Sequence, residues 1–266
     1  MDQSRFGTHL SQIILVFLLG LMSPTTVFEA QFGPLLTPAQ APQARSQQEL
    51  DAYLEIITAP AAHEVVNKVD LFASRFPKSE LLGIAYQYQM RAFEQLNDFD
   101  GMLTAGKKSL LSNPDNLNTL MTLAPALANH ASQRPDRAIL LAQAEEYAHR
   151  ALQGIERTQI PRKIPLEHWE LEKRGMQGQA HEVLGVVAMQ RGQLQTAIGE
   201  FETAVHLSPH PKGVQFFRLG LAFASAGEKS NAEKVLRRAA ELGPDPVRKL
   251  ALHELKKMTD RESAAK

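Results

Sequence analysis

Apolar side chains recur with helical spacing along most of the chain from about Ser46 onward. In the stretch LGVVAMQRGQLQTAIGEFETAVHLSP, residues 184–209, apolar positions return every three or four residues, which is the period of an amphipathic helix. The later stretch FFRLGLAFASAGEKSNAEKVLRRAAELGP shows the same period. No convincing segment alternates apolar and polar residues in steps of two, as a half-buried strand does. The pattern therefore predicts an all-α protein.

Glycines interrupt these helical stretches at matching places. An interior glycine costs a helix up to about 1 kcal/mol relative to alanine, so its placement needs a physical reason. Residues 178–209 and 213–244 align without a gap, and the identical positions include Leu184 with Leu219, Gly185 with Gly220, Gly192 with Gly227, Ala197 with Ala232, Ala204 with Ala239 and Pro209 with Pro244. So many matches in order indicate an internal repeat.

The repeat resembles that of the tetratricopeptide family, which has an aromatic residue, then Leu-Gly and Tyr, then Ala and Phe, and finally Pro. The other family positions hold His181, Ala188 and Phe201 in the first stretch and Phe216, Phe223 and Leu236 in the second. The resemblance implies a right-handed α-solenoid of tetratricopeptide helix-turn-helix repeats. We expect roughly four helix pairs and a C-terminal capping helix between about Ser46 and Met258.

The repeat explains most of the glycines. Two antiparallel helices approach closely only where one side chain is very small, so we assign Gly185 and Ala197 to the crossing point of a helix pair. Gly192 is expected in the turn, where a positive φ ends the first helix without a steric penalty. Gly199 matches no family position, and we expect it at an exposed helical site.

The same template divides the rest of the chain. Repeats are expected at residues 46–77 (degenerate), 83–116, 117–157 (irregular), 178–211 and 213–246, followed by a cap at 247–258 and a tail at 259–266. In the 83–116 unit, Met102 and Gly106 replace the usual small and aromatic pair, and residues 97–100 are expected to form the turn. The cap is expected to present Leu250, Leu252 and Leu255 on one side.

One first helix is longer than the family's. After a loop bounded by Pro161 and Pro165, we expect a helix from Leu166 to Gln190, about twelve residues longer than usual. Trp169 lies on its apolar stripe, and the preceding helix offers a similar stripe between residues 144 and 155. The two lengthened neighbours are therefore expected to cover each other.

The N-terminal residues predict export. The apolar run IILVFLLGLM, from Ile13 to Met22, is too short for a bilayer span and suits the hydrophobic region of a secretory signal. Residues 1–30 are expected to be a signal peptide or an N-terminal anchor, because Ala30 favours cleavage while Phe28 disfavours it. Residues 31–45 are expected to be a Pro/Gln/Ala-rich linker. The junction FPKSE at Phe76 is similar to one common in tetratricopeptide proteins of bacterial envelopes, so we expect a periplasmic or envelope-associated protein.

Charge and composition exclude several kinds of partner. Lysine plus arginine equals aspartate plus glutamate, at 29 each, so the chain lacks the positive excess that drives binding to nucleic acids or anionic membranes. Cysteine is absent, which excludes disulfides, thiolate zinc sites and cysteine nucleophiles. We expect no nucleic-acid partner, and membrane contact only through an uncleaved N-terminal segment. The oligomeric state is left open.

The sequence contains fragments of catalytic motifs, but none of these motifs is complete. His181-Glu182 begins like a zinc-protease motif, but Gly185 stands where the second histidine belongs. His181 takes the family's aromatic position, so we expect it in the core. His206 and His210 are separated by Pro209, which breaks the helix that would align them. We therefore expect no catalytic residue, no cofactor and no metal, and we keep an unrecognised enzyme as a second alternative.

The resemblance implies that the first helices of the repeats line a groove, which in this family commonly holds an extended peptide or a partner helix. The family's groove positions fall on Gln87, Arg91, Glu94, Asn118, Met121, Pro125, Glu182, Val186, Met189, Phe217 and Leu221. In some members of the family, lysines and asparagines of successive repeats bind the C-terminal carboxylate of a partner. This carboxylate clamp is not matched here, because only Arg91 and Asn118 are suitably polar.

The sequence thus predicts a non-catalytic scaffold or adaptor in the cell envelope that binds a partner peptide or helix in this groove. The alternative is a structural subunit of a larger envelope assembly. It would dock through the long helix at residues 166–190, with Trp169 as the contact.

Overall fold

The structure is a computed structural model that describes residues 42–158 and 165–264. The predicted signal peptide or anchor, the linker up to residue 41 and the Pro161 end of the predicted loop lie outside the described residues. The described residues from 44 onward belong to one compact unit, residues 44–266. None of its helices has the length and apolar character that crossing a membrane requires.

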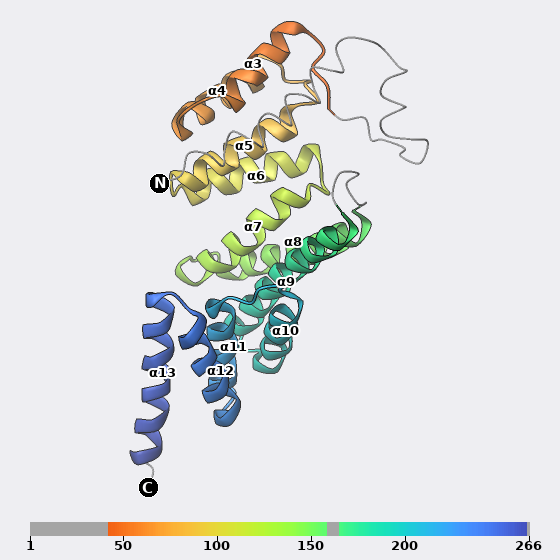
Figure 1. Ribbon diagram of the computed structural model, residues 1–266. Coiled ribbons are helices and arrows are strands. Elements are labelled where there is room, and N and C mark those ends of the chain that lie inside the picture. The colour runs from red at the N-terminus through yellow and green to blue at the C-terminus, as the bar shows by residue number, and fades with distance from the viewer. Residues whose placement is uncertain (1–41, 159–164, 265–266) are drawn as a thin grey trace. The chain divides into compact units, whose positions relative to one another are not determined.

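The described residues form helices and no strand, which confirms the predicted fold class (Figure 1). The helices are α3 (Gln47–Ile57), α4 (Ala62–Arg75), α5 (Leu82–Gln95), α6 (Phe99–Ser112), α7 (Leu117–His130), α8 (Arg137–Arg157), α9 (Leu166–Gln190), α10 (Leu194–Leu207), α11 (Gly213–Ser225), α12 (Lys229–Leu242) and α13 (Asp245–Ala264), with a short 3₁₀ helix, η2 (Ala131–Gln133), after α7. They pack as five consecutive antiparallel pairs followed by α13.

Side-chain caps and turn residues set where several helices begin and end. The Ser46 hydroxyl accepts a hydrogen bond from the Glu49 amide at 3.1 Å, and the Asp98 carboxylate accepts one from the Gly101 amide at 2.8 Å. Gly192 and Gly227 have φ of 74° and 81°, as predicted for the turns. Asn97, with φ of 56°, takes the same role between α5 and α6. That turn is shorter than predicted, because α6 already begins at Phe99.

Glycine makes room for a large side chain within the two C-terminal pairs. A Cβ atom on Gly185 would lie 2.5 Å from Cδ1 of Phe201, and one on Gly220 would lie 2.7 Å from Cδ2 of Leu236. The predicted crossing point is therefore made by Gly185 against Phe201, with Ala197 fully buried beside it. A Cβ atom on Gly199 would meet no atom within 4 Å, which agrees with the expected exposed site.

Two sequence predictions about single positions are wrong. His181 is half-buried rather than in the core, and its Nδ1 atom lies 2.7 Å from a carboxylate oxygen of Glu200 on α10. Leu250 and Leu252 of the cap are each 52% exposed, whereas Ala251 between them is fully buried. Helical geometry puts Ala251 and Leu255 on one face, so the small alanine marks the packed side and the two leucines flank it.

The lengthened helices α8 and α9 cover each other, as expected. Near the end of α8, the Glu156 carboxylate accepts hydrogen bonds from Lys173 at 2.9 Å and from Gln177 at 2.5 Å, both on α9. The hydrogen bond and ion pair with Glu156 raise the pKa of Lys173. These contacts hold the N-terminal half of α9, which extends beyond the ordinary repeat, alongside α8.

Candidate functional site

Three adjoining pockets run across the first helices of successive pairs. The first has a volume of about 290 Å³ and lies between α7 and the junction of α5 with α6. The central pocket, of about 120 Å³, lies among α7, α8, α9 and α11, and the third, of about 730 Å³, lies between α9 and the segment 208–215. Pro125 lines both the first and the central pocket, while Gln179 and Glu182 line both the central and the third. We call this continuous surface the pocket row.

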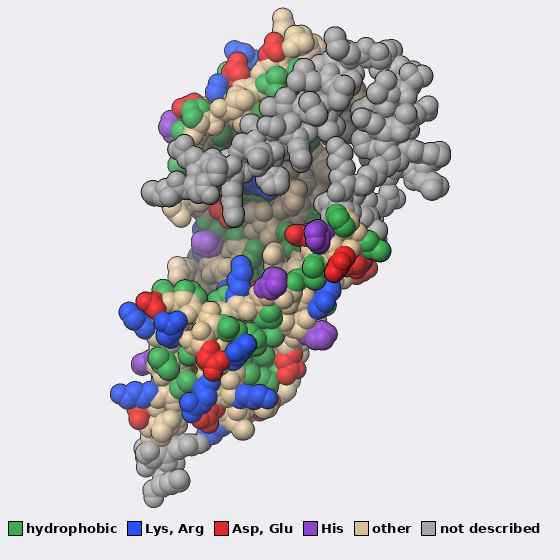
Figure 2. Space-filling model, in the orientation of Figure 1, with side chains coloured by type: hydrophobic (Ala, Val, Ile, Leu, Met, Phe, Trp, Pro, Cys, Tyr) green, Lys and Arg blue, Asp and Glu red, His purple; other side chains and the backbone are tan. Residues whose placement is uncertain are grey.

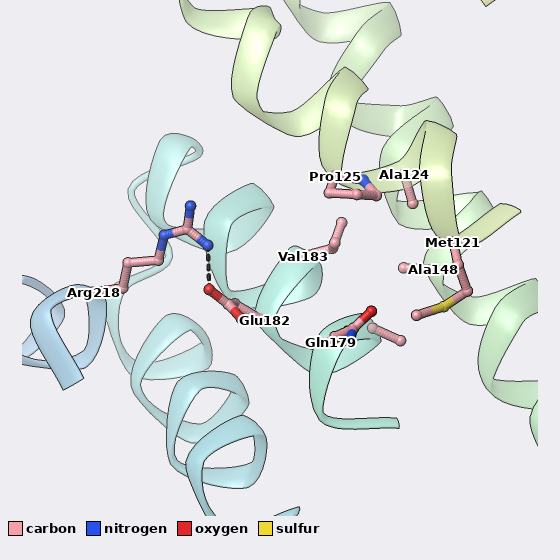
Figure 3. A pocket seen from close by; sticks show the side chains of 9 residues that line it. Met121, Ala124, Pro125, Ala148, Gln179, Glu182, Val183 and Arg218 are labelled. Carbon is pink, nitrogen blue, oxygen red and sulfur yellow. Dashed lines mark hydrogen bonds and ion pairs between the residues drawn. The ribbon is translucent and has the colours of Figure 1, made fainter. Parts of the chain in front are cut away.

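The central pocket has an apolar wall and a charged edge (Figure 3). Its lining consists of Met121, Ala124, Pro125, Ala148, Gln179, Ala180, Glu182, Val183 and Arg218. Pro125 lies inside α7, where its ring replaces a backbone N–H group with apolar surface. The alanines keep the neighbouring helices close, and the pocket remains because no large side chain fills the space between them.

The charged edge of the central pocket is a fixed hydrogen-bond network. A Glu182 carboxylate oxygen pairs with the Arg218 guanidinium, drawn as a dashed line in Figure 3, and the other accepts a hydrogen bond from the Gln215 amide at 3.2 Å. Gln215 also donates to the Ser208 hydroxyl at 2.9 Å. Only 15% of the Glu182 side chain is exposed. The network therefore joins α9 to α11 and neutralises charge beside the apolar wall.

The first pocket contains an aromatic stack between α6 and α7. The Phe99 ring stacks on the His130 ring with centroids 4.3 Å apart. The Arg134 guanidinium lies 5.4 Å from the Phe99 ring centroid and forms ion pairs with Asp100 at 3.0 Å and Asp136 at 3.1 Å. The hydrogen bonds to Asp100 and Asp136 raise the pKa of Arg134. Glu94 and Asp98 also line this pocket, which makes its rim acidic.

The third pocket is broad and has mixed chemistry. Leu171 and Met176 of α9 face it together with Val214 of α11, and its polar lining includes His168 and Lys212. Arg174 donates a hydrogen bond to the His206 carbonyl at 3.1 Å, which holds α9 against the end of α10 beside the pocket.

The structure brings only some of the predicted groove residues together. Met121, Pro125 and Glu182 meet in the central pocket, and Glu94 lines the first. The others do not line the three pockets: Arg91 and Asn118 are exposed, and Gln87, Val186, Met189, Phe217 and Leu221 are half-buried. Gln87 also accepts a hydrogen bond from Asn116 at 3.4 Å. Trp169 is only 8% exposed.

Sequence reasoning missed Gln179, Gln215 and Arg218, which line the central and third pockets. The repeat alignment places Phe217 opposite Glu182, and Arg218 is the next residue. The opposite charges of Glu182 and Arg218 in adjacent first helices were the available signal, because such residues can pair across neighbouring repeats.

Within residues 42–158 and 165–264, no group of three or more His, Cys, Asp or Glu side chains is placed to hold a metal ion. Figure 2 shows basic and acidic side chains interspersed over the C-terminal helices. There Arg237 pairs with Glu233 at 2.6 Å and Arg238 with Glu241 at 2.9 Å. Several basic residues of the C-terminal helices are thus paired with carboxylates.

Similar proteins are found through structure rather than sequence. No protein-family model and no curated protein matches the chain. A solved structure described as MamA RS-1 ArsTM double mutant is 14% identical, with a TM-score of 0.57 over 75% of this chain and 96% of its own. TTC0263, a thermophilic TPR protein in Thermus thermophilus, is 17% identical, with a TM-score of 0.51 over 79% of this chain and 98% of its own. The chain therefore has the all-α solenoid fold of tetratricopeptide-repeat proteins.

Proposed function

We propose that this protein is a non-catalytic scaffold that binds a segment of another protein along the pocket row. The observation that carries the proposal is the continuity of the three pockets, because Pro125 joins the first to the central pocket while Gln179 and Glu182 join the central to the third. A continuous surface over several repeats suits an extended or helical segment better than a compact small molecule. The fold supports the same function, because stacked helix pairs present extended binding surfaces.

The proposal is tested by filling the pocket row. Gln179 is exposed and lies between the central and the third pocket, so Gln179→Trp places a large ring over their boundary without disturbing the core. We expect this variant to lose a partner that wild type retains in crosslinking and affinity capture from native membranes. Gln153→Trp, at an exposed α8 position outside the three pockets, is the matched control and keeps the partner. Retention by both variants would contradict the proposal.

A second candidate is a structural subunit that docks through α9. The observation in its favour is the exposure of Leu166 at 59% and Leu171 at 40% in the lengthened part of this helix. Trp169, the contact predicted from the sequence, is buried, so docking would use the leucines beside it. Leu166 lies outside the three pockets, and Leu166→Glu therefore separates the two candidates. Loss of the partner with Leu166→Glu alone favours docking through α9.

We also propose that the scaffold acts outside the cytoplasm, in or near the cell envelope. The apolar run from Ile13 to Met22 and the FPKSE junction support this location. A reporter fused after Ser46, active only outside the cytoplasm, tests it, and mass spectrometry of the N-terminus distinguishes cleavage from anchoring. A reporter that is active only in the cytoplasm would overturn this part of the proposal.

A further inference from the structure

The first pocket has an acidic rim. Glu94 and Asp98 line it, and no lysine or arginine among the described residues does so. Arg91, one turn earlier on α5, does not line the pocket, and neither does Arg134, which is paired with Asp100 and Asp136. The two carboxylates that line the pocket are therefore not balanced by a lysine or arginine in its lining, which leaves an excess of negative charge there. An occupant with a positive charge complements that excess.

The shape of the first pocket suits a long side chain with a charged end. Its volume is about 290 Å³, and Phe99, Met102 and Ala126 supply an apolar wall. Glu94 is exposed at the rim. Lysine and arginine bury an aliphatic stem while the charged head stays at the surface, which matches an apolar wall below an acidic rim.

The central pocket suits a different side chain. Glu182 and Arg218 neutralise each other there, and most of the remaining lining is aliphatic. The volume of about 120 Å³ is somewhat smaller than that of an apolar cavity of about 150 Å³ that binds benzene. One leucine or isoleucine side chain fits this space, whereas an indole is too large.

We propose that the partner segment carries a lysine or arginine that enters the first pocket and a leucine or isoleucine that enters the central pocket. Pro125 lines both pockets, so the two side chains come from nearby positions of the same segment. This inference rests on the proposed function and adds the chemistry of the partner to it.

The probes are short synthetic peptides of glycine and serine that each contain one leucine and one lysine. The number of residues between the leucine and the lysine varies across the set from none to a few. Matched sets carry glutamine or glutamate in place of lysine, and alanine or tryptophan in place of leucine. The purified full chain is expected to bind the best lysine–leucine peptide about tenfold more tightly than its glutamate counterpart. Added salt reduces this preference, because the rim is exposed.

Glu94→Gln is the decisive variant, since Glu94 caps no helix, whereas Asp98 caps α6. It is expected to lose most of the preference for lysine, and Glu94→Lys is expected to reverse it. Glu202→Gln, at an exposed position of α10 outside the pockets, is the matched control and keeps the preference. Melting curves of all three variants verify that they fold.

Three results overturn the inference: equal binding of lysine and glutamate peptides, a preference for glutamate, or a lysine preference that survives Glu94→Gln. Equal binding of the alanine, leucine and tryptophan sets overturns the assignment of the central pocket. If peptides bind along the pocket row without a charge preference, this inference is wrong but the proposed function stands. If wild type and Gln179→Trp bind every set equally, or wild type binds none, the proposed function fails with it.

Discussion

The C-terminal pairs α9–α10 and α11–α12 follow the repeat pattern, whereas the pair α7–α8 departs from it. In the regular pairs, Gly185 and Gly220 let the helices close around Phe201 and Leu236. In α7–α8, Ala124 is buried and Pro125 lies inside the first helix. The central pocket lies where these two regions meet. The regular repeats thus form a closely packed support, and the departure from the pattern leaves the space of the central pocket.

The largest effect is expected in the irregular region. Leu123 of α7 is fully buried, and it occupies the space that Gly106 leaves open on α6. Leu123→Ala removes this contact and leaves a cavity, so we expect it to lower the free energy of unfolding by about 3 kcal/mol. Denaturant titration measures the change. A loss of less than about 1 kcal/mol would show that the pairs α5–α6 and α7–α8 do not pack through Leu123.

A smaller loss is expected at the regular crossing point. Gly185→Leu forces a side chain against the Phe201 ring, which overpacks the pair, and we expect destabilisation by about 2 kcal/mol. A double-mutant cycle with Phe201→Ala sharpens the test, because the smaller partner makes room for the new side chain. Additive effects of the two substitutions would contradict direct contact.

The sequence predicted the regular region better than the site, for physical reasons. Gly192 and Gly227 were predictable because only a residue tolerant of positive φ fits these turns. Helix α9 was predictable because its apolar period runs from Leu166 to Gln190. These features depend on contacts between neighbours along the chain.

The pocket row depends on contacts between residues far apart in sequence. Arg218 was missed because its role arises only when α11 brings it to Glu182 on α9. His181 was misplaced because an aromatic position can also hold a polar ring where a carboxylate, here Glu200, lies opposite. Repeat patterns specify which helices pair, but side-chain lengths decide where a pocket remains between them.

The ion pair at the boundary of the two regions gives a third prediction. Arg218→Ala leaves the largely buried Glu182 carboxylate with the Gln215 amide as its remaining partner. We expect a loss of about 1 kcal/mol, because the arginine side chain is 32% exposed and solvent screens the pair. Glu182→Gln combined with Arg218→Ala removes the uncompensated charge and is expected to recover part of the loss. A melting temperature unchanged in Arg218→Ala would show that the network adds no stability.

The smallest expected effect is a gain in stability. Gly199 lies inside α10 with no atom near its missing Cβ, so Gly199→Ala raises helix propensity without a clash. We expect stabilisation of up to about 1 kcal/mol. The same substitution at Gly185 is expected to destabilise, and thermal unfolding of the two variants compares an open site with a crossing point. Equal shifts in the two variants would contradict this difference.

The proposed function places a partner segment in the pocket row, where the regular and irregular regions meet. Site-specific photocrosslinking in cells tests it most directly, with the crosslinking side chain placed at Gln179 and, as a control, at the exposed α8 position Gln153. We expect one discrete crosslinked protein from position 179 and none from position 153. Crosslinks from position 153 to the same protein, with none from position 179, would contradict it.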